Sequence, residues 1–171
     1  MDSIVGRAKQ FAFVAHNAIN QRRKYTGEPY TEHLERVAKL VENVDHDANM
    51  LAAAYLHDTV EDTATTIEDI TAEFGEDIAY LVLHLTDVSR PQDGNRAVRK
   101  TLEREHIASG VARVHTVKLA DLIDNSESIQ SHDAKYAKVY MEEKRLLLTV
   151  LADGDPKLFE RASRIGADWN G

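Results

Sequence analysis

Apolar residues recur along this chain at the three- and four-residue spacing of amphipathic helices. Leu34, Val37, Ala38, Val41 and Val44 form one such stripe, and comparable stripes occupy most of the chain. No stretch shows the strict alternation of apolar and polar residues that indicates a half-buried strand. The pattern therefore predicts an all-α fold.

Prolines and turn-forming residues divide this pattern into separate helices. Pro29, Pro91 and Pro156 each stand at a break between apolar stripes, where a proline cannot continue a helix. The least regular stretch, 86–94, is rich in turn formers and is the best candidate for a lid or gate. We expect about nine helices in one bundle that forms a single domain over 1–171. Their ranges are 3–22, 31–44, 48–58, 67–74, 77–85, 95–109, 113–130, 134–152 and 156–166.

Composition narrows the chemistry that this bundle can carry. The chain has no cysteine, which excludes disulfides, zinc–thiolate sites, iron–sulfur clusters and cysteine nucleophiles. Any bound metal must therefore be held by histidine and carboxylate side chains. The N-terminus lacks the apolar core of a signal peptide, and no apolar run is long enough to span a bilayer. These features predict a cytoplasmic protein without a membrane partner.

The net charge of −8 argues against a nucleic-acid partner, because such affinity comes mainly from a basic surface that neutralises phosphates. A small phosphorylated ligand needs only a local positive pocket. Basic residues are concentrated in 22–24 and in 96–104. Solvated helix faces are the simpler explanation of both stretches unless other residues point to phosphate.

The dipeptide His-Asp occurs three times, and only one copy falls in an apolar context. His46-Asp47 and His132-Asp133 lie in polar turns, where the Asp is expected to cap the next helix and the His to be exposed. His57-Asp58 instead continues the apolar stripe that begins near Met50. An inward-facing carboxylate is costly unless it is paired, hydrogen-bonded or bound to a metal. A buried His–Asp hydrogen bond is the alternative to a metal site.

Two further polar residues share this inward orientation. Asp121 stands at helical spacing from Val114 and Val117, with Lys118 one turn before it and Asn125 one turn after it.

His33 opens the amphipathic helix that is expected from residue 31. Together with His57 and Asp58, His33 and Asp121 supply two imidazoles and two carboxylates, a set that suits Mn²⁺, Fe²⁺, Co²⁺ or Zn²⁺.

Two acids follow the inward-facing His-Asp pair after one helical turn. Glu61 and Asp62 lie four residues beyond His57 and Asp58, so a continued helix would place both acids beside the metal. A neighbouring carboxylate can orient an attacking water or take its proton. The alternative is a pair of solvated acids at the end of a helix.

At this point the assembled motifs resemble the hydrolase domain of the RelA/SpoT family, and in particular its single-domain small alarmone hydrolases. The resemblance covers residues from Phe11 to about Asn125. It is carried by Gln-Arg-Arg-Lys-Tyr-Thr-Gly-Glu-Pro-Tyr-Thr-Glu-His (21–33), Ala-Ala-Ala-Tyr-Leu-His-Asp-Thr-Val-Glu-Asp (52–62), Glu-Phe-Gly (73–75) and Val-Lys-Leu-Ala-Asp (117–121).

The resemblance implies a role for each residue that matches these motifs. The implied Mn²⁺ ligands are His33, His57, Asp58 and Asp121. Glu61 and Asp62 would position and activate the attacking water. Arg23 would pack on the purine base, Lys24 would face the phosphates, and Asn125 would contact the nucleotide. The implied reaction removes pyrophosphate from the 3′ side of ppGpp or pppGpp, the alarmones of the stringent response.

The chain also departs from the family pattern. Family members usually carry a basic residue and an aromatic residue or His at the positions of Leu122 and Asp124, so the preferred base or phosphate pattern is open. The alternatives are hydrolysis of another nucleotide, such as an adenosine alarmone or NADPH, and a non-catalytic alarmone sensor. The larger family members append a synthetase domain, and we expect none in this chain.

Overall fold

The structure is a computed structural model that describes residues 3–167. The prediction of an all-α fold is confirmed for this part of the chain, where the only β pairing is an isolated bridge between Arg22 and Pro29. Each of the nine predicted helices has a counterpart, and the short α4 (Thr59–Asp62) and the 3-10 helix η1 (Pro91–Asp93) were not predicted. None of the helices in the described range combines the length and the apolar character needed to cross a bilayer.

The described residues form two compact units, which meet in sequence between Thr86 and Asp87. The prediction that the whole chain forms one domain stays a prediction. Besides α4, the helices of the first unit are α1 (Ile4–Ala18), α2 (Thr31–Glu42), α3 (Ala48–Leu56), α5 (Ile67–Phe74) and α6 (Glu76–Leu85).

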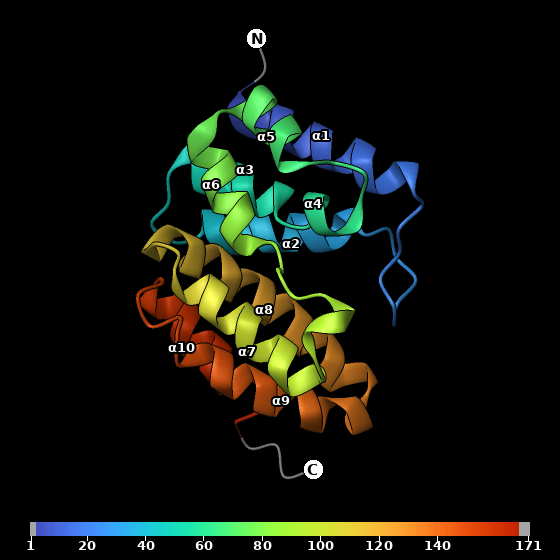
Figure 1. The fold of residues 1–171 in the computed structure, drawn as a ribbon, viewed down its shortest axis with the longest axis vertical. Helices are drawn as coiled ribbons and strands as arrows, with labels where there is room; N and C mark the ends of the chain where they lie inside the picture. The colour runs from blue at the N-terminus through green and yellow to red at the C-terminus, as the bar shows by residue number, and fades with distance from the viewer. Residues whose placement is uncertain (1–2, 168–171) are drawn as a thin grey trace. The chain divides into compact units, whose positions relative to one another are not determined.

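Helix α3 is the central element of the first unit. Figure 1 shows it among α1, α2 and α6, and all three pack against it. Its sequence is apolar on every side, which is typical of a helix enclosed by others, and the residues from Ala52 to Leu56 are buried. The helix starts where the carboxylate of Asp47 accepts a hydrogen bond from the backbone N–H of Met50 at 2.8 Å. Its far end delivers His57 and Asp58 into this packed environment.

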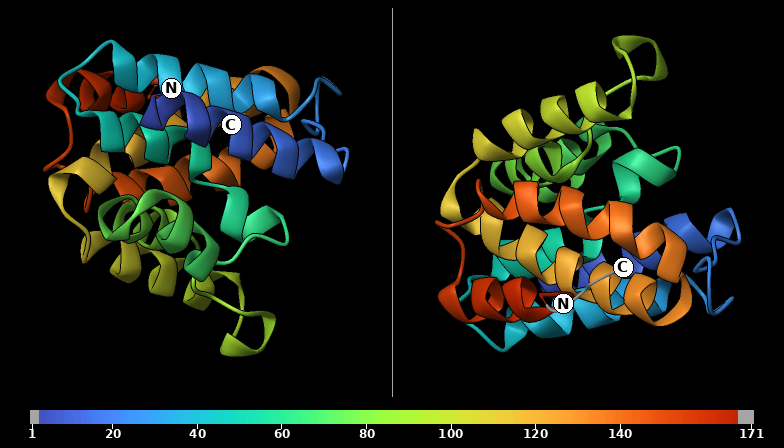
Figure 2. Two further views of the ribbon diagram at one scale, coloured as in Figure 1. Left: turned by 90° about the horizontal axis from the view of Figure 1, so that it is seen from above. Right: turned by 90° about the horizontal axis from the view of Figure 1, so that it is seen from below.

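In the second unit, η1 precedes four helices: α7 (Arg96–Ala108), α8 (Ala112–His132), α9 (Ala134–Leu148) and α10 (Pro156–Arg164). Helix α8 packs against the other three, and η1 lies at the start of α7 (Figure 2). Gly154, before α10, lies so close to α8 that an added Cβ would stand 2.6 Å from Leu119 Cδ1. The absence of a side chain at this position therefore allows the two segments to pack closely.

Several helix ends differ from the prediction, by up to four residues. The first helix ends at Ala18 rather than at 22, because the chain then turns to pair Arg22 with Pro29. The third helix ends at Leu56, and α4 starts separately at Thr59. The predicted helix 134–152 ends at Leu148.

Candidate functional site

His57 and Asp58 form the junction between α3 and α4. His57 is 2% exposed, and its Nδ1 lies 2.7 Å from the carbonyl oxygen of Ala54. Because a carbonyl can only accept a hydrogen bond, Nδ1 carries the proton. Nε2, on the other side of the ring, lies 3.0 Å from Asp58 Oδ2. This nitrogen either presents its lone pair to a cation shared with Asp58 or carries a second proton as an imidazolium.

His33 joins this pair from the first turn of α2. It is fully buried, its Nε2 lies 3.6 Å from Asp58 Oδ2, and its ring centroid is 5.4 Å from that of His57. Each of the three residues offers one ligand atom, and these atoms lie within 4.8 Å of one another. His33, His57 and Asp58 thus form a candidate metal site within the first unit.

The donor set of this candidate site suits a divalent metal ion. A ligand histidine usually donates its second ring N–H to a carbonyl or carboxylate, as His57 does toward Ala54. Two atoms bound to one ion by bonds of about 2.1 Å stand roughly 3 to 3.5 Å apart. His57 Nε2 lies 3.0 Å and His33 Nε2 lies 3.6 Å from Asp58 Oδ2, which is close to this spacing.

Tyr30 supports the Asp58 carboxylate and was not predicted as a site residue. Its hydroxyl donates a hydrogen bond to Asp58 Oδ2 at 2.6 Å. Its ring contacts the rings of His16 and His33, with centroids 4.9 Å and 5.3 Å away. The Gly-Glu-Pro-Tyr motif contains this residue, but sequence spacing offers no sign that its hydroxyl reaches a carboxylate 28 residues later.

Asp121 belongs to α8 in the second unit. It is 5% exposed, and its two carboxylate oxygens accept hydrogen bonds from Lys118 Nζ at 3.0 Å and Asn125 Nδ2 at 2.9 Å. The predicted row of an amine, a carboxylate and an amide on one helix face is therefore confirmed. The role of Asp121 as a fourth metal ligand stays a prediction.

Glu61 and Asp62 lie in α4, one turn after His57 and Asp58. Glu61 is exposed, whereas Asp62 is partly buried and accepts a hydrogen bond from Gln21 Nε2 at 3.0 Å on its Oδ2. Burial and the nearby charge of Asp58 raise the pKa of Asp62, and the hydrogen bond from Gln21 partly opposes this effect. The two acids thus stand in different environments, and one oxygen of Asp62 is held by Gln21.

Arg23 and Lys24 lie in the loop between α1 and α2. Backbone hydrogen bonds from Arg23 N to the oxygen of Glu28 and from Tyr30 N to the oxygen of Gln21 close this loop. The Arg23 guanidinium lies over the Tyr30 ring, 5.9 Å from its centroid, and Lys24 lies over Tyr25. Arg23 is thus connected through Tyr30 to Asp58, whereas Lys24 is exposed at the loop surface.

The other two His-Asp dipeptides lie at the starts of helices. Asp47 and Asp133 cap α3 and α9, and their neighbours His46 and His132 are exposed, as predicted. His132 is however the last residue of α8, so its predicted place in a turn is wrong.

In the second basic stretch, Arg96 contacts both carboxylate oxygens of Glu143 and donates a hydrogen bond to Tyr136 at 2.6 Å. Lys100 in the same stretch pairs with Glu103 at 2.7 Å, so at least two of its cations are engaged in ion pairs within the unit. Leu122 and Asp124, where the chain departs from the family pattern, are both buried.

Two other polar residues near Asp62 were missed by the sequence reasoning. Gln21 lies in the first motif, where no role was assigned to it. His16 is fully buried in α1, on the same face as the buried Ala8 and Ala12. Its four-residue spacing from these two alanines was a usable signal that this imidazole points inward.

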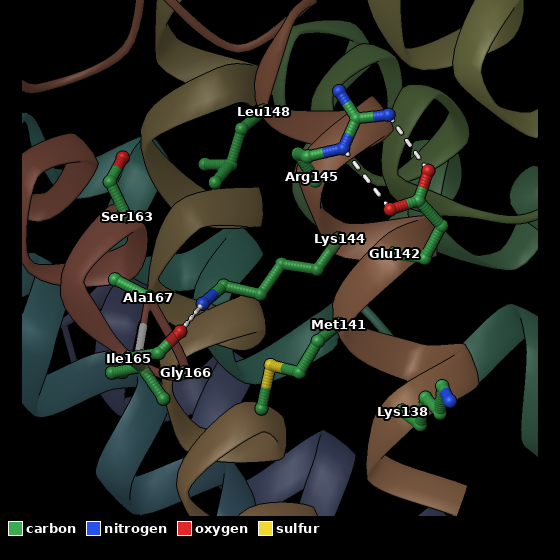
Figure 3. A pocket seen from close by; sticks show the side chains of 10 residues that line it. All are labelled: Lys138, Met141, Glu142, Lys144, Arg145, Leu148, Ser163, Ile165, Gly166 and Ala167. Carbon is green, nitrogen blue, oxygen red and sulfur yellow. Dashed lines mark hydrogen bonds and ion pairs between the residues drawn. The ribbon is translucent and has the colours of Figure 1, made fainter. Parts of the chain in front are cut away.

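A separate hollow of about 530 Å³ lies in the second unit, between α9 and the segment after α10 (Figure 3). Figure 3 shows Lys144 reaching the carbonyl oxygen of Ile165 and Arg145 paired with Glu142. Two basic side chains of the hollow are thus engaged within the unit, which argues against a phosphate site there. Its lining residues are Lys138, Met141, Glu142, Lys144, Arg145, Leu148, Ser163, Ile165, Gly166 and Ala167.

The similarity of this chain to known proteins identifies its family. The family model described as HD domain matches residues 8–155 of the chain. The chain belongs to the HD-domain family. The matched range contains all three His-Asp dipeptides, and His57-Asp58 is the copy that lies beside His33.

Individual relatives of this HD domain confirm the resemblance to RelA/SpoT-type hydrolases. A guanosine-3′,5′-bis(diphosphate) 3′-pyrophosphohydrolase of Xenopus tropicalis, MESH1, is 36% identical over 131 residues, which cover 75% of this chain and 70% of the relative. A probable enzyme of the same name from Synechocystis sp. is also 36% identical over 131 residues, which are 75% of this chain but only 17% of that protein. This HD domain thus spans about a sixth of the length of the Synechocystis relative.

A solved structure is also similar to this HD domain. It is that of a metazoan ortholog of SpoT that hydrolyzes ppGpp, with a TM-score of 0.86 and 28% sequence identity. The match covers 99% of this chain and 97% of the other. The all-α HD-domain fold is thereby confirmed.

Proposed function

We propose that this HD domain hydrolyses the 3′-diphosphate ester of a guanosine alarmone. Water and ppGpp would yield GDP and pyrophosphate, and pppGpp would yield GTP and pyrophosphate. The observation that carries the proposal is the cluster of His33, His57 and Asp58, with the His57 Nδ1 proton held by Ala54. The names of the relatives supply the substrate class.

The proposed metal site consists of His33, His57, Asp58 and, from the second unit, Asp121. HD-domain hydrolases depend on a metal, and the residues of the first unit have the donor atoms and spacing that suit one ion. The HD-domain match spans both units, which supports assigning Asp121 to the same site. We propose Mn²⁺ as the ion, because it accepts mixed imidazole and carboxylate ligands. Such an ion would supply Lewis acidity that makes a water easier to deprotonate.

In the proposed reaction, Asp62 takes the proton of the attacking water and Glu61 orients that water. The raised pKa of Asp62 makes its carboxylate a stronger base than an ordinary exposed one, which suits proton transfer near neutral pH. Tyr30 holds the Asp58 carboxylate through its hydroxyl. Lys118 and Asn125 hold the two oxygens of Asp121 in the same manner.

We propose that Arg23 stacks on the guanine base, with Lys24 on the phosphates and Asn125 on the nucleotide. A planar guanidinium has two faces, and Tyr30 lies against Arg23 on one side, which suits a base on the other. Because the net charge of −8 disfavours long-range attraction of a polyanion, these short-range contacts must supply the affinity. We expect the enzyme to act on the nucleotide pool of the cytoplasm.

A second candidate substrate follows from Leu122 and Asp124. Both residues depart from the family pattern, so the nucleotide preference can differ from that of the relatives. The candidates are an adenosine alarmone and NADPH, which require the same metal residues. A sensor without catalysis requires binding residues only, and the retention of both Glu61 and Asp62 argues against it.

A turnover assay tests the proposed function. The purified chain is stripped of metal with a chelator, supplied with Mn²⁺, and given ppGpp, pppGpp, ppApp or NADPH in parallel. We expect metal-dependent release of pyrophosphate from the guanosine alarmones, and its loss in a His57→Ala, Asp58→Ala double variant. Full metal content in that double variant would overturn the ligand assignment, and nucleotide binding without turnover in the wild type would favour the sensor.

A further inference from the structure

A chain of hydrogen bonds leads from a buried histidine to Asp62. The Nδ1 atom of His16 lies 2.6 Å from Gln21 Oε1, and the amide nitrogen of the same Gln21 donates to Asp62 Oδ2 at 3.0 Å. All three residues belong to the first unit. His16 and Gln21 are not metal ligands in the proposed site, and no substrate contact has been assigned to either of them.

The charge of Asp62 sets the direction of every bond in this chain. An ionised carboxylate only accepts hydrogen bonds, so the amide nitrogen of Gln21 must face Asp62 and its oxygen must face His16. The imidazole must then carry its proton on Nδ1. A flipped Gln21 would place its oxygen 3.0 Å from a carboxylate oxygen, where two acceptors repel each other.

The far end of this chain is held in place by packing. His16 is fully buried, and its ring lies against that of Tyr30 at a 30° angle with centroids 4.9 Å apart. Among the described residues, its Nε2 is buried without a hydrogen-bond partner, so Nδ1 makes the only polar contact of the ring. The residue therefore gives Gln21 a fixed anchor.

We infer that His16 and Gln21 are positioning residues that hold the Asp62 carboxylate in one orientation. Gln21 occupies Oδ2, and within residues 3–167 Asp62 has no other side-chain hydrogen bond. Its Oδ1 is thereby the oxygen presented for proton transfer. This inference rests on the proposed function, in which Asp62 takes the proton of the attacking water.

The simpler explanation is that His16 and Gln21 only stabilise the loop after α1. Gln21→Glu separates the two explanations, because a glutamate keeps the acceptor for His16 and replaces the donor to Asp62 with a repelling oxygen. We expect kcat to fall about tenfold or more, a part of the 100-fold or larger contribution of a general base, while KM changes less than twofold. Thr26→Ala, in an exposed part of the same loop, is the matched control and should change neither constant.

Two further variants complete the kinetic test. His16→Asn keeps an N–H near the position of Nδ1 and should retain most of kcat, whereas His16→Leu should lower kcat as Gln21→Glu does. In an Asp62→Asn background, Gln21→Glu should cause no further loss of kcat, since both changes act through one group. Additive losses, or a raised KM with normal kcat, would overturn the inference in favour of a loop-stabilising role.

A measurement without substrate separates this inference from the proposed function. Nitrogen-15 NMR of labelled histidines reports which ring nitrogen carries the proton. We expect His16 to be protonated on Nδ1 in the wild type, and Asp62→Ala to introduce the Nε2–H form because Gln21 is then free to flip. Two results would overturn the proposed coupling between Asp62 and His16. One is a wild-type His16 protonated on Nε2, and the other is a His16 tautomer that is unchanged in Asp62→Ala. Absence of turnover on every nucleotide would instead refute the proposed function.

Discussion

Removing the Tyr30 hydroxyl tests whether the candidate metal site depends on the support of Asp58. Tyr30→Phe deletes one oxygen atom and the 2.6 Å hydrogen bond that it donates to Asp58 Oδ2. The ring remains, together with its contacts to His16 and Arg23. The variant therefore changes one polar contact and preserves the packing around it.

The size of the effect follows from the kind of bond that is lost. A hydrogen bond to a charged group contributes about 1.5–3 kcal/mol, and loss of a group that orients a metal ligand typically weakens metal binding roughly 10- to 100-fold. The side chain of Asp58 is only 15% exposed, so water replaces the lost donor poorly. We expect Mn²⁺ to bind Tyr30→Phe about tenfold or more weakly than the wild type.

Competition with a chromophoric chelator measures this affinity directly. Tyr55→Phe is the matched control, because the Tyr55 hydroxyl also donates to a carboxylate, that of Glu35 at 3.0 Å, in the same unit. Metal affinity should be unchanged in this control. A Tyr30→Phe variant that binds Mn²⁺ as tightly as the wild type would show that Asp58 is not held by Tyr30 for metal binding, and would refute the reasoning.

Four other outcomes follow from the structure. Asp62→Asn should retain metal but lose roughly 100-fold or more in kcat, and normal turnover in steady-state assays would show that Asp62 is not the general base. Arg23→Lys should raise KM although it conserves charge, because an ammonium stacks poorly on a base, and an unchanged KM would place the base elsewhere. Burial lowers the pKa of Lys144 to about 8 from 10.5, so the folded state binds this proton less tightly than the unfolded chain. The free energy of unfolding should therefore rise by about 1 kcal/mol per pH unit between these values, and urea titrations of Lys144→Gln should lack the rise. Gly154→Ala should lower the unfolding free energy by roughly 1–3 kcal/mol through overpacking against Leu119, and an unchanged melting temperature would contradict this.

Sequence alone determined the helices and the inward-facing polar residues, because both depend on neighbours within one or two turns. The apolar stripes located every helix longer than four residues in the described range. The capping roles of Asp47 and Asp133 follow from side chains that bind backbone N–H groups three residues on. His57 was identified because it continues the apolar stripe of α3 directly after that helix, and Asp121 because it interrupts the apolar face of α8.

Helix ends were less predictable where a distant contact stops the helix. The sequence pattern carries α1 on to residue 22, but the chain leaves the helix after Ala18 and directs Gln21 toward Asp62, 41 residues away. A hydrogen bond across that separation has no signature in local spacing. Residues 19–22 thus continue the helical sequence pattern, but the tertiary contact of Gln21 with Asp62 overrides it.

Only the tertiary structure decided which side chains support the candidate site. Tyr30 reaches Asp58 across 28 residues, and the bond directions from Asp62 through Gln21 to His16 follow from atoms that only folding brings together. The tautomer of His57, by contrast, is set locally by the carbonyl of Ala54, three residues earlier. Residue types and their spacing predict which groups face inward, whereas the partner of each donor and acceptor depends on three-dimensional proximity, because hydrogen bonds act over only about 3 Å.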